Sequence, residues 1–98
     1  MPIVLKSARE LELMRQAGRI VAEVLARMQA EVAPGVTTAD LNAAADALIR
    51  KRGGLPSFKG YHGYPASICA SINQEVVHGI PSKKRALKLG DLVSVDVG

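Results

Sequence analysis

Aromatic residues are nearly absent from this 98-residue chain, which contains one phenylalanine, two tyrosines and no tryptophan. A core must therefore be built from aliphatic side chains, many of them alanines that each remove little surface from water. No stretch approaches the roughly 20 apolar residues that cross a bilayer, so we expect no association with membranes. The length allows one small domain and excludes a multidomain enzyme.

Cysteine is also scarce, since Cys69 is the only one and cannot form a disulfide within the chain. The first six residues lack the longer apolar segment and cleavage site of a secretory leader. Both observations favour a reducing compartment, and we expect the protein to be cytoplasmic.

Acidic residues are outnumbered, with nine Asp and Glu against 13 Lys and Arg, which gives a formal net charge of +4. Basic residues cluster at positions 50–52 and 83–88. The first cluster ends an expected helix, where cations complement the helix dipole, and the second lies in an expected loop. Because no nucleic-acid-binding motif accompanies the charge, nucleic acid is not expected as the main partner.

The first half of the chain has the apolar period of helices. Ser7 with Glu10 and Thr37 with Asp40 form capping boxes, and Pro34-Gly35 and Gly53-Gly54 stop the two patterns. The sequence therefore predicts an antiparallel helical hairpin over about residues 7–53. We expect a long apolar stripe of the first helix to be covered, with a second backbone close to Gly18; the stripe comprises Leu11, Met14, Gly18, Val21, Leu25, Met28 and Val32, broadened by Ile20 and Val24.

The second half, about residues 55–98, has the alternation of short strands. Strands are expected over residues 66–72, 76–80 and 92–97. The first should place Ile68, Ala70 and Ile72 on one face and Ser67, Cys69 and Ser71 on the other. Because an uncovered sheet edge is usually avoided, we expect another polypeptide to cover it.

Several residues of this half could carry chemistry. The segment Gly60–Pro65 gathers two tyrosines and a histidine before a strand, either as the wall of an apolar pocket or as a small hydrophobic cluster under a loop. His78 could donate to a developing charge or be a packed core histidine. Asp96 could bind a cation, orient an imidazole or be solvated. Cys69 with His62 or His78 is formally a nucleophile and base, although a buried cysteine often serves as a small apolar residue.

A set of motifs in a fixed order resembles the N-terminal portion of type I methionine aminopeptidases. The resemblance covers almost the whole chain and is carried by Met14–Arg19, Pro34–Thr38, Gly60–Pro65, Ser71–Asn73, His78–Pro81, Leu89–Asp91 and Val95–Val97. It implies an α+β fold, half of a pita-bread fold, with two antiparallel helices packed on a small antiparallel sheet.

The resemblance also implies roles for single residues. Asp96 takes the place of the first metal-binding aspartate, and His78 that of the histidine that contacts the scissile peptide. The pocket for the methionine side chain is implied for Phe58, Tyr61, Tyr64 and Cys69, with His62 beside it. In the family, two divalent ions, which can be cobalt, manganese, iron or zinc, activate a water for attack on the peptide.

One metal ligand does not make a metal site, since a catalytic ion typically takes three protein ligands. We therefore expect a truncated N-terminal half that is inactive alone and pairs as a two-fold homodimer. Two alternatives stay open: one part of a split methionine aminopeptidase that is active with a complementary C-terminal half, and a non-catalytic module that binds N-terminal methionine peptides.

Overall fold

The computed structural model describes residues 5–73 and 79–98. Their elements, in chain order, are helix α1 (Ala8–Glu31), helix α2 (Thr38–Lys51), a short 3-10 helix η1 (Tyr61–Gly63), strand β1 (Ile68–Ile72) and strand β2 (Val93–Val97).

Both helices begin at the capping boxes that the sequence predicts. The Glu10 amide donates to Ser7 Oγ at 3.1 Å and the Ser7 amide donates to Glu10 Oε1 at 3.0 Å. Thr37 and Asp40 repeat the exchange at 3.1 and 2.9 Å. Each pair satisfies amide donors that the first helical turn leaves without partners, so local sequence sets both helix starts.

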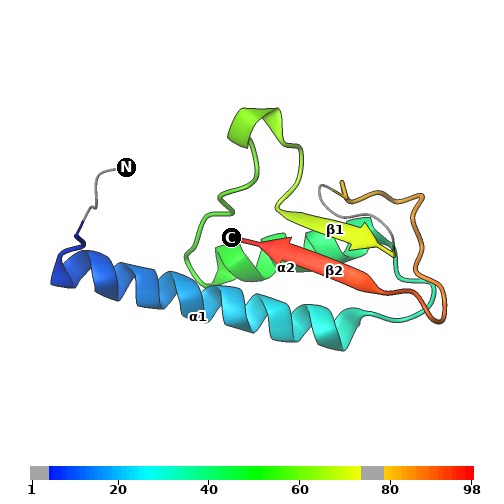
Figure 1. Ribbon diagram of the computed structural model, residues 1–98, viewed down its shortest axis with the longest axis horizontal. Helices are drawn as coiled ribbons and strands as arrows, with labels where there is room; N and C mark the ends of the chain where they lie inside the picture. The colour runs from blue at the N-terminus through cyan, green and yellow to red at the C-terminus, as the bar shows by residue number, and fades with distance from the viewer. Residues whose placement is uncertain (1–4, 74–78) are drawn as a thin grey trace.

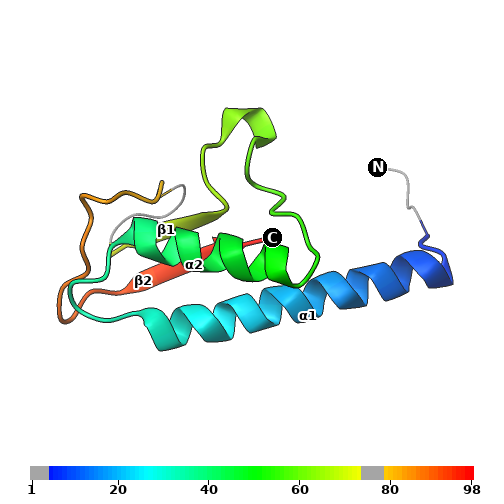
Figure 2. The same cartoon turned by 180° about the vertical axis from the view of Figure 1, so that it is seen from behind.

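The two strands form an antiparallel pair in which Ile68 lies opposite Val97 and Ile72 lies opposite Val93. Figures 1 and 2 show α1 and α2 running in opposite directions, with α2 lying over one face of the sheet. The predicted α+β fold, with two antiparallel helices on a small antiparallel sheet, is confirmed.

The core lies between the helices and the sheet. Leu41, Ala45 and Ile49 of α2 pack with Ile68 and Ala70 of β1. Val93, Val95 and Val97 contribute the partly buried side chains of β2. The alternation predicted for residues 68–72 and 93–97 is therefore correct, and Cys69, Ser71, Ser94 and Asp96 lie on the opposite, open face. It is wrong for Ser67, which precedes β1 and donates its hydroxyl to Asp46 of α2.

The prediction that the whole stripe of α1 is covered is wrong for the described chain. Residues 8–19 are all exposed, and α1 buries only Val24 and Met28. Figures 1 and 2 show why, since the first half of α1 extends past both α2 and the sheet. Gly18 lies in this exposed part, and a Cβ built there meets no atom within 4 Å, so the expected close backbone is also missing.

The expected strand over 76–80 can be assessed only at its end, because residues 76–78 lie outside the described residues. Gly79 and Ile80 belong to no strand. Gly79 nevertheless lies against the edge of β1, where its carbonyl accepts a hydrogen bond from the Ala70 amide at 2.8 Å.

Candidate functional site

A pocket of about 660 Å³ lies between the open face of the sheet and the segment that carries η1. Its volume is in the range typical of small-ligand sites, about 300–1,000 Å³. Figure 1 shows the η1 segment rising away from α1, beyond the sheet. The lining residues are Phe58, Tyr61, His62, Gly63, Tyr64, Pro65, Cys69, Ser71, Ile80, Ser94, Val95 and Asp96.

The strand side of the pocket is set by the pairing of β1 with β2. Cys69 lies opposite Asp96, and Ser71 lies opposite Ser94. The core-facing residues alternate with these four, which therefore share the open face. The sheet thus offers a thiol, two hydroxyls and a carboxylate to the pocket.

The loop side of the pocket is built from rings on a sharply turned backbone. Phe58 and Tyr64 pack edge to face with their ring centroids 6.5 Å apart. Tyr61 and His62 are 4.3 Å apart, also edge to face. His62 has a φ of 48°, a left-handed conformation that is uncommon for a residue with a side chain and is often found at functional sites.

Tyr64 joins the loop side to the strand side. Its hydroxyl donates to the carbonyl oxygen of Ile68 at 2.9 Å, immediately before Cys69. Burial raises the pKa of the Tyr64 phenol above its ordinary range, and a hydrogen bond with Cys69 and the nearby charge of Asp96 act in the same direction. The phenol therefore stays protonated at neutral pH and remains a hydrogen-bond donor.

The structure brings together six of the seven site residues named from the sequence. Phe58, Tyr61, His62, Tyr64, Cys69 and Asp96 all line this one pocket. The seventh, His78, lies outside the described residues. His62 packs against Tyr61, and among the described residues it forms no hydrogen bond with Cys69, while the alternative pairing of Cys69 with His78 lies outside the described residues.

Among the described residues, Asp96 lacks the further ligands that a catalytic metal ion requires. Within 5–73 and 79–98, no group of three or more His, Cys, Asp or Glu side chains could hold an ion. Cys69 is the only such residue directly opposite Asp96. Because catalytic ions typically take three protein ligands, the described residues do not fit a complete metal centre.

Two pocket residues, Ser71 and Ser94, were not named as candidates from the sequence. The alternation that places Cys69 and Asp96 on the open face also places these serines there, so that signal could have identified them. The polar contacts behind the pocket, made by Asn42 and Asp46 of α2, had no comparable local signal.

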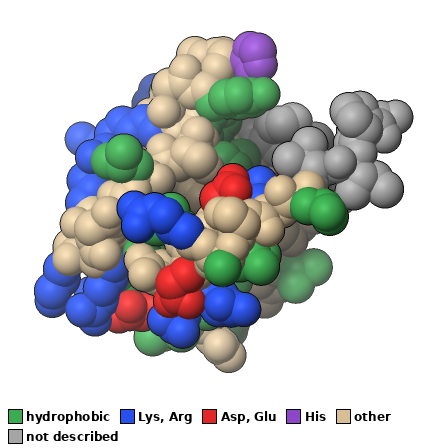
Figure 3. Space-filling view, turned by 90° about the vertical axis from the view of Figure 1, so that its left-hand side faces the viewer, with side chains coloured by type: hydrophobic (Ala, Val, Ile, Leu, Met, Phe, Trp, Pro, Cys, Tyr) green, Lys and Arg blue, Asp and Glu red, His purple; other side chains and the backbone are tan. Residues whose placement is uncertain are grey.

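Charges on the surface are largely interspersed. Arg52 forms a bidentate pair with Glu23, and Arg50 pairs with Asp46. Figure 3 views the end where α1 begins and shows Lys and Arg side chains along one side with Asp and Glu side chains among them. No helix of the described part is long and apolar enough to cross a membrane.

Comparison with known proteins identifies the family. Residues 12–98 match the family described as Metallopeptidase family M24. The chain belongs to metallopeptidase family M24. It is 57% identical over 96 residues to a methionine aminopeptidase of Clostridium acetobutylicum and 55% identical over 93 residues to one of Mycobacterium tuberculosis.

Solved structures of M24 methionine aminopeptidases have the same fold over this length. The crystal structure of the Thermotoga maritima methionine aminopeptidase superposes with a TM-score of 0.95 at 42% identity, covering 98% of this chain and 39% of that one. The match to the Clostridium relative spans 98% of this chain but only 38% of the relative's length, and the match to the Mycobacterium relative spans 95% of this chain but only 35% of that relative's length. The 98 residues therefore correspond to the N-terminal portion of these metallopeptidases.

Proposed function

We propose that this chain supplies the side-chain pocket and one metal-binding carboxylate of a methionine aminopeptidase. The observation that supports the proposal is the pocket of about 660 Å³ in which Phe58, Tyr64 and Cys69 lie beside Asp96. An apolar wall with one carboxylate at its edge suits a thioether side chain bound next to the site of hydrolysis. His78 is proposed to contact the scissile peptide, and His62 to flank the pocket.

Hydrolysis is proposed to need ligands from a complementary C-terminal segment. A divalent ion supplies a nucleophilic hydroxide and polarises the peptide carbonyl when several side chains hold it. Asp96 would be one of those side chains, and the ion could be cobalt, manganese, iron or zinc. The 98 residues alone are therefore proposed to form one inactive N-terminal half-domain in the cytoplasm.

A pocket-blocking variant tests the methionine pocket. L-Methionine should protect Cys69 from alkylation by iodoacetamide, because the thiol lines the pocket and is the only one in the chain. Ser94→Phe should abolish the protection, since Ser94 also lines the pocket. Leu92→Phe is the matched control, because Leu92 is 68% exposed just before β2 and does not line this pocket. If L-methionine does not protect Cys69 from alkylation in the unmodified chain, the proposed methionine pocket is excluded.

A mixing assay tests the need for a C-terminal segment. The chain should not cleave a Met-Ala-Ser peptide with cobalt or manganese unless a C-terminal portion of a close relative is added. Turnover by the chain alone, above a chelator-treated control, would contradict this part of the proposal. Methionine protection with no turnover after mixing would instead favour the non-catalytic module that binds N-terminal methionine peptides.

Without that segment, we propose that the chain forms a two-fold homodimer. Among the described residues, β2 pairs only with β1, and residues 8–19 of α1 are uncovered. Unpaired strand edges and exposed apolar stripes both favour association. Sedimentation equilibrium should give twice the mass of one chain, and a monomer over the accessible concentration range would exclude the dimer.

A further inference from the structure

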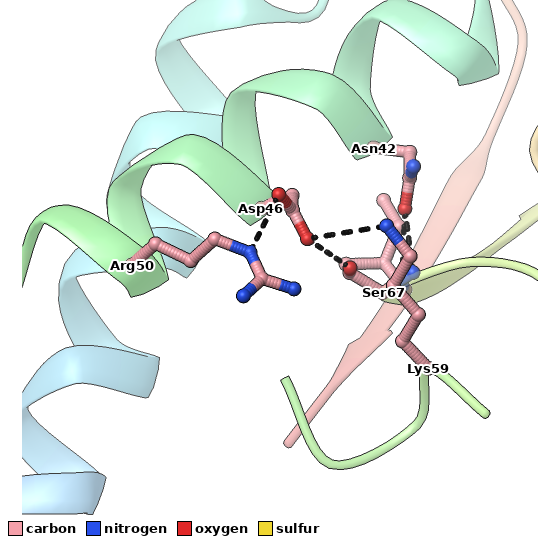
Figure 4. Close-up of polar contacts among 6 residues, drawn as sticks. Asn42, Asp46, Arg50, Lys59 and Ser67 are labelled. Carbon is pink, nitrogen blue, oxygen red and sulfur yellow. Dashed lines mark hydrogen bonds and ion pairs between the residues drawn. The ribbon is translucent and has the colours of Figure 1, made fainter. Parts of the chain in front are cut away.

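One stripe of polar side chains on α2 faces the segment 59–67, which carries the pocket rings of Tyr61, His62 and Tyr64. Asn42, Asp46 and Arg50 follow one another at intervals of four residues, so they lie on the same side of the helix. Figure 4 shows their side chains together with Lys59 and Ser67, which come from the two ends of the ring-bearing segment. None of these five residues lines the pocket.

The end of the segment is held by both Asn42 and Asp46. Asn42 Oδ1 accepts hydrogen bonds from the Ser67 amide at 2.8 Å and from the Ile68 amide at 3.2 Å. Asp46 Oδ1 accepts one from the Ser67 hydroxyl at 2.7 Å (Figure 4). Ser67 and Ile68 are fully buried, so water could not replace these partners without rearrangement.

The start of the segment reaches the same carboxylate. Lys59 Nζ lies 3.9 Å from Asp46 Oδ1, while Arg50 Nε donates to Asp46 Oδ2 at 3.0 Å. Asp46 therefore contacts Lys59 and Ser67 at the same time, so one carboxylate links the two ends of the segment. Tyr61, His62 and Tyr64 lie within that segment.

The link from α2 to the pocket passes through one residue. The Ile68 amide is bound by Asn42, and the Ile68 carbonyl accepts the Tyr64 hydroxyl at 2.9 Å. Cys69 follows directly and faces the pocket. A shift of residues 67 and 68 would therefore move both the Tyr64 phenol and the Cys69 thiol.

We infer that Asn42 and Asp46 are positioning residues for the pocket: by holding the segment 59–67 at its ends, they set the placement of Tyr64 and Cys69 without touching the pocket. The inference rests on the proposed function for its substrate, a methionine side chain. The geometry of the segment can be read separately, because Cys69 is a unique chemical probe of it.

The test compares Asp46→Asn and Asn42→Ala with Glu23→Gln in the 98-residue chain. Asp46→Asn keeps the shape of the side chain and removes its charge. Glu23→Gln is the matched control, because it weakens an exposed bidentate contact between α1 and Arg52 that involves neither the segment 59–67 nor the pocket lining. Alkylation of Cys69 is measured without and with L-methionine, at a temperature at which circular dichroism shows each variant fully folded.

Asn42→Ala removes the acceptor of two hydrogen bonds, and Asp46→Asn replaces a charged acceptor by a neutral one. Both variants should change the Cys69 alkylation rate and weaken methionine protection by about 2- to 10-fold, the range expected for a hydrogen bond. Glu23→Gln should match the unmodified chain in both measurements. Asp46→Asn should also have a smaller effect in Ser67→Ala than in the unmodified chain, because the Ser67 hydroxyl is one of the two segment contacts of Asp46, the other being Lys59.

Equal alkylation rates and equal methionine protection in Asp46→Asn and Glu23→Gln would overturn the inference. If Asn42→Ala does not fold, Asp46→Asn and Ser67→Ala decide the question by the same two measurements. If methionine protects no variant, including the unmodified chain, the proposed function fails, and the Cys69 rates alone still show whether α2 holds the segment.

Discussion

Cys69 on β1 lies directly opposite Asp96 on β2, on the face of the sheet that the helices leave open. Side chains directly opposite in an antiparallel pair have Cβ atoms about 4.5–5.5 Å apart. The pairing therefore fixes the thiol and the carboxylate beside each other at the edge of the proposed methionine pocket. The pairing of Cys69 with Asp96 does not supply a third ligand for a metal ion.

Metal binding by the 98 residues should be weak and should depend on Asp96. We expect a Kd of about 10⁻³ M or weaker for manganese alone, because even calcium sites with six to eight oxygen ligands reach Kd values as weak as about 10⁻³ M. Paramagnetic broadening by manganese should be greatest in the nuclear magnetic resonance signals of residues around Asp96 and should disappear in Asp96→Asn. Glu12→Gln, which removes an exposed carboxylate on α1, is the control. Broadening that survives Asp96→Asn would place the ion elsewhere.

Gly79 should be the least replaceable glycine of the described chain. A Cβ at this position would lie 2.2 Å from the Ala70 carbonyl oxygen and 2.8 Å from Ser71 Cα, both of them backbone atoms of β1. We expect Gly79→Ala to lower the free energy of unfolding by about 1–3 kcal/mol, as overpacking does. The change would also displace the backbone that precedes Pro81 and follows His78.

Gly18→Ala is the matched control for Gly79, because its new Cβ meets nothing within 4 Å and its backbone is helical. Alanine is the better helix former, so this variant should gain about 0.5–1 kcal/mol. Urea unfolding should therefore give a lower free energy of unfolding for Gly79→Ala and a higher one for Gly18→Ala than for the unmodified chain. A loss of stability in Gly18→Ala would mean that another backbone does approach α1, as the sequence had suggested.

Sequence patterns identified most of this architecture because the signals are local. Both capping boxes need only four consecutive residues, and the alternation of β1 and β2 places Cys69 and Asp96 on one face. The pocket could be anticipated because its rings cluster between residues 58 and 64. Contacts such as Asn42 with Ser67 could not, because 25 residues separate the partners and either could have been solvated.

The exposed half of α1 shows a different limit of sequence reasoning. An apolar stripe predicts that a surface is covered, but it does not say which polypeptide covers it. Leu11 and Met14 continue the stripe of Val24 and Met28, yet they are 43% and 55% exposed, whereas the latter two are buried. The stripe was therefore correct as a pattern and wrong as a description of packing within the described chain.

Acid should destabilise the protein partly through Asp46. A hydrogen bond from the Ser67 hydroxyl, aided by Arg50 and Lys59, holds the pKa of the Asp46 carboxyl below its ordinary value. At pH values between the lowered pKa of Asp46 in the folded chain and its pKa of about 3.9 in the unfolded chain, the unfolded chain binds more protons than the folded chain. The stabilisation is thus complete above the unfolded value and is lost as pH falls through the folded pKa.

Urea unfolding of the unmodified chain and Asp46→Asn measures this effect across about pH 2–7, a range that extends about two units below and about three units above the ordinary Asp pKa. The stability difference between them should shrink toward acid pH. Ser67→Ala should show a shallower acid dependence than the unmodified chain, because it lacks the bond that lowers the pKa most. A difference that stays constant down to the lowest pH would contradict the assignment.

Substitutions along α1 should divide at the point where the helix leaves the core. Met14→Ser, in the uncovered part, should change the free energy of unfolding by no more than about 0.5 kcal/mol. Met28→Ala, in the part of α1 that packs in the core, should cost about 2–5 kcal/mol because it leaves a cavity where the native side chain is buried. Denaturation at low protein concentration, where association is least, isolates these effects within one chain.

Met14→Ser, compared with Gly18→Ala, then distinguishes packing within the chain from packing between chains. If a second copy or a C-terminal segment covers residues 8–19, Met14→Ser should weaken association while leaving the isolated chain as stable as before. Sedimentation equilibrium of Met14→Ser measures that loss directly, with Gly18→Ala as a variant of the same exposed helix that removes no apolar side chain. Undiminished association in Met14→Ser would exclude this part of α1 from the contact and leave, as the surface to examine, the edge of β2 that no described strand pairs with.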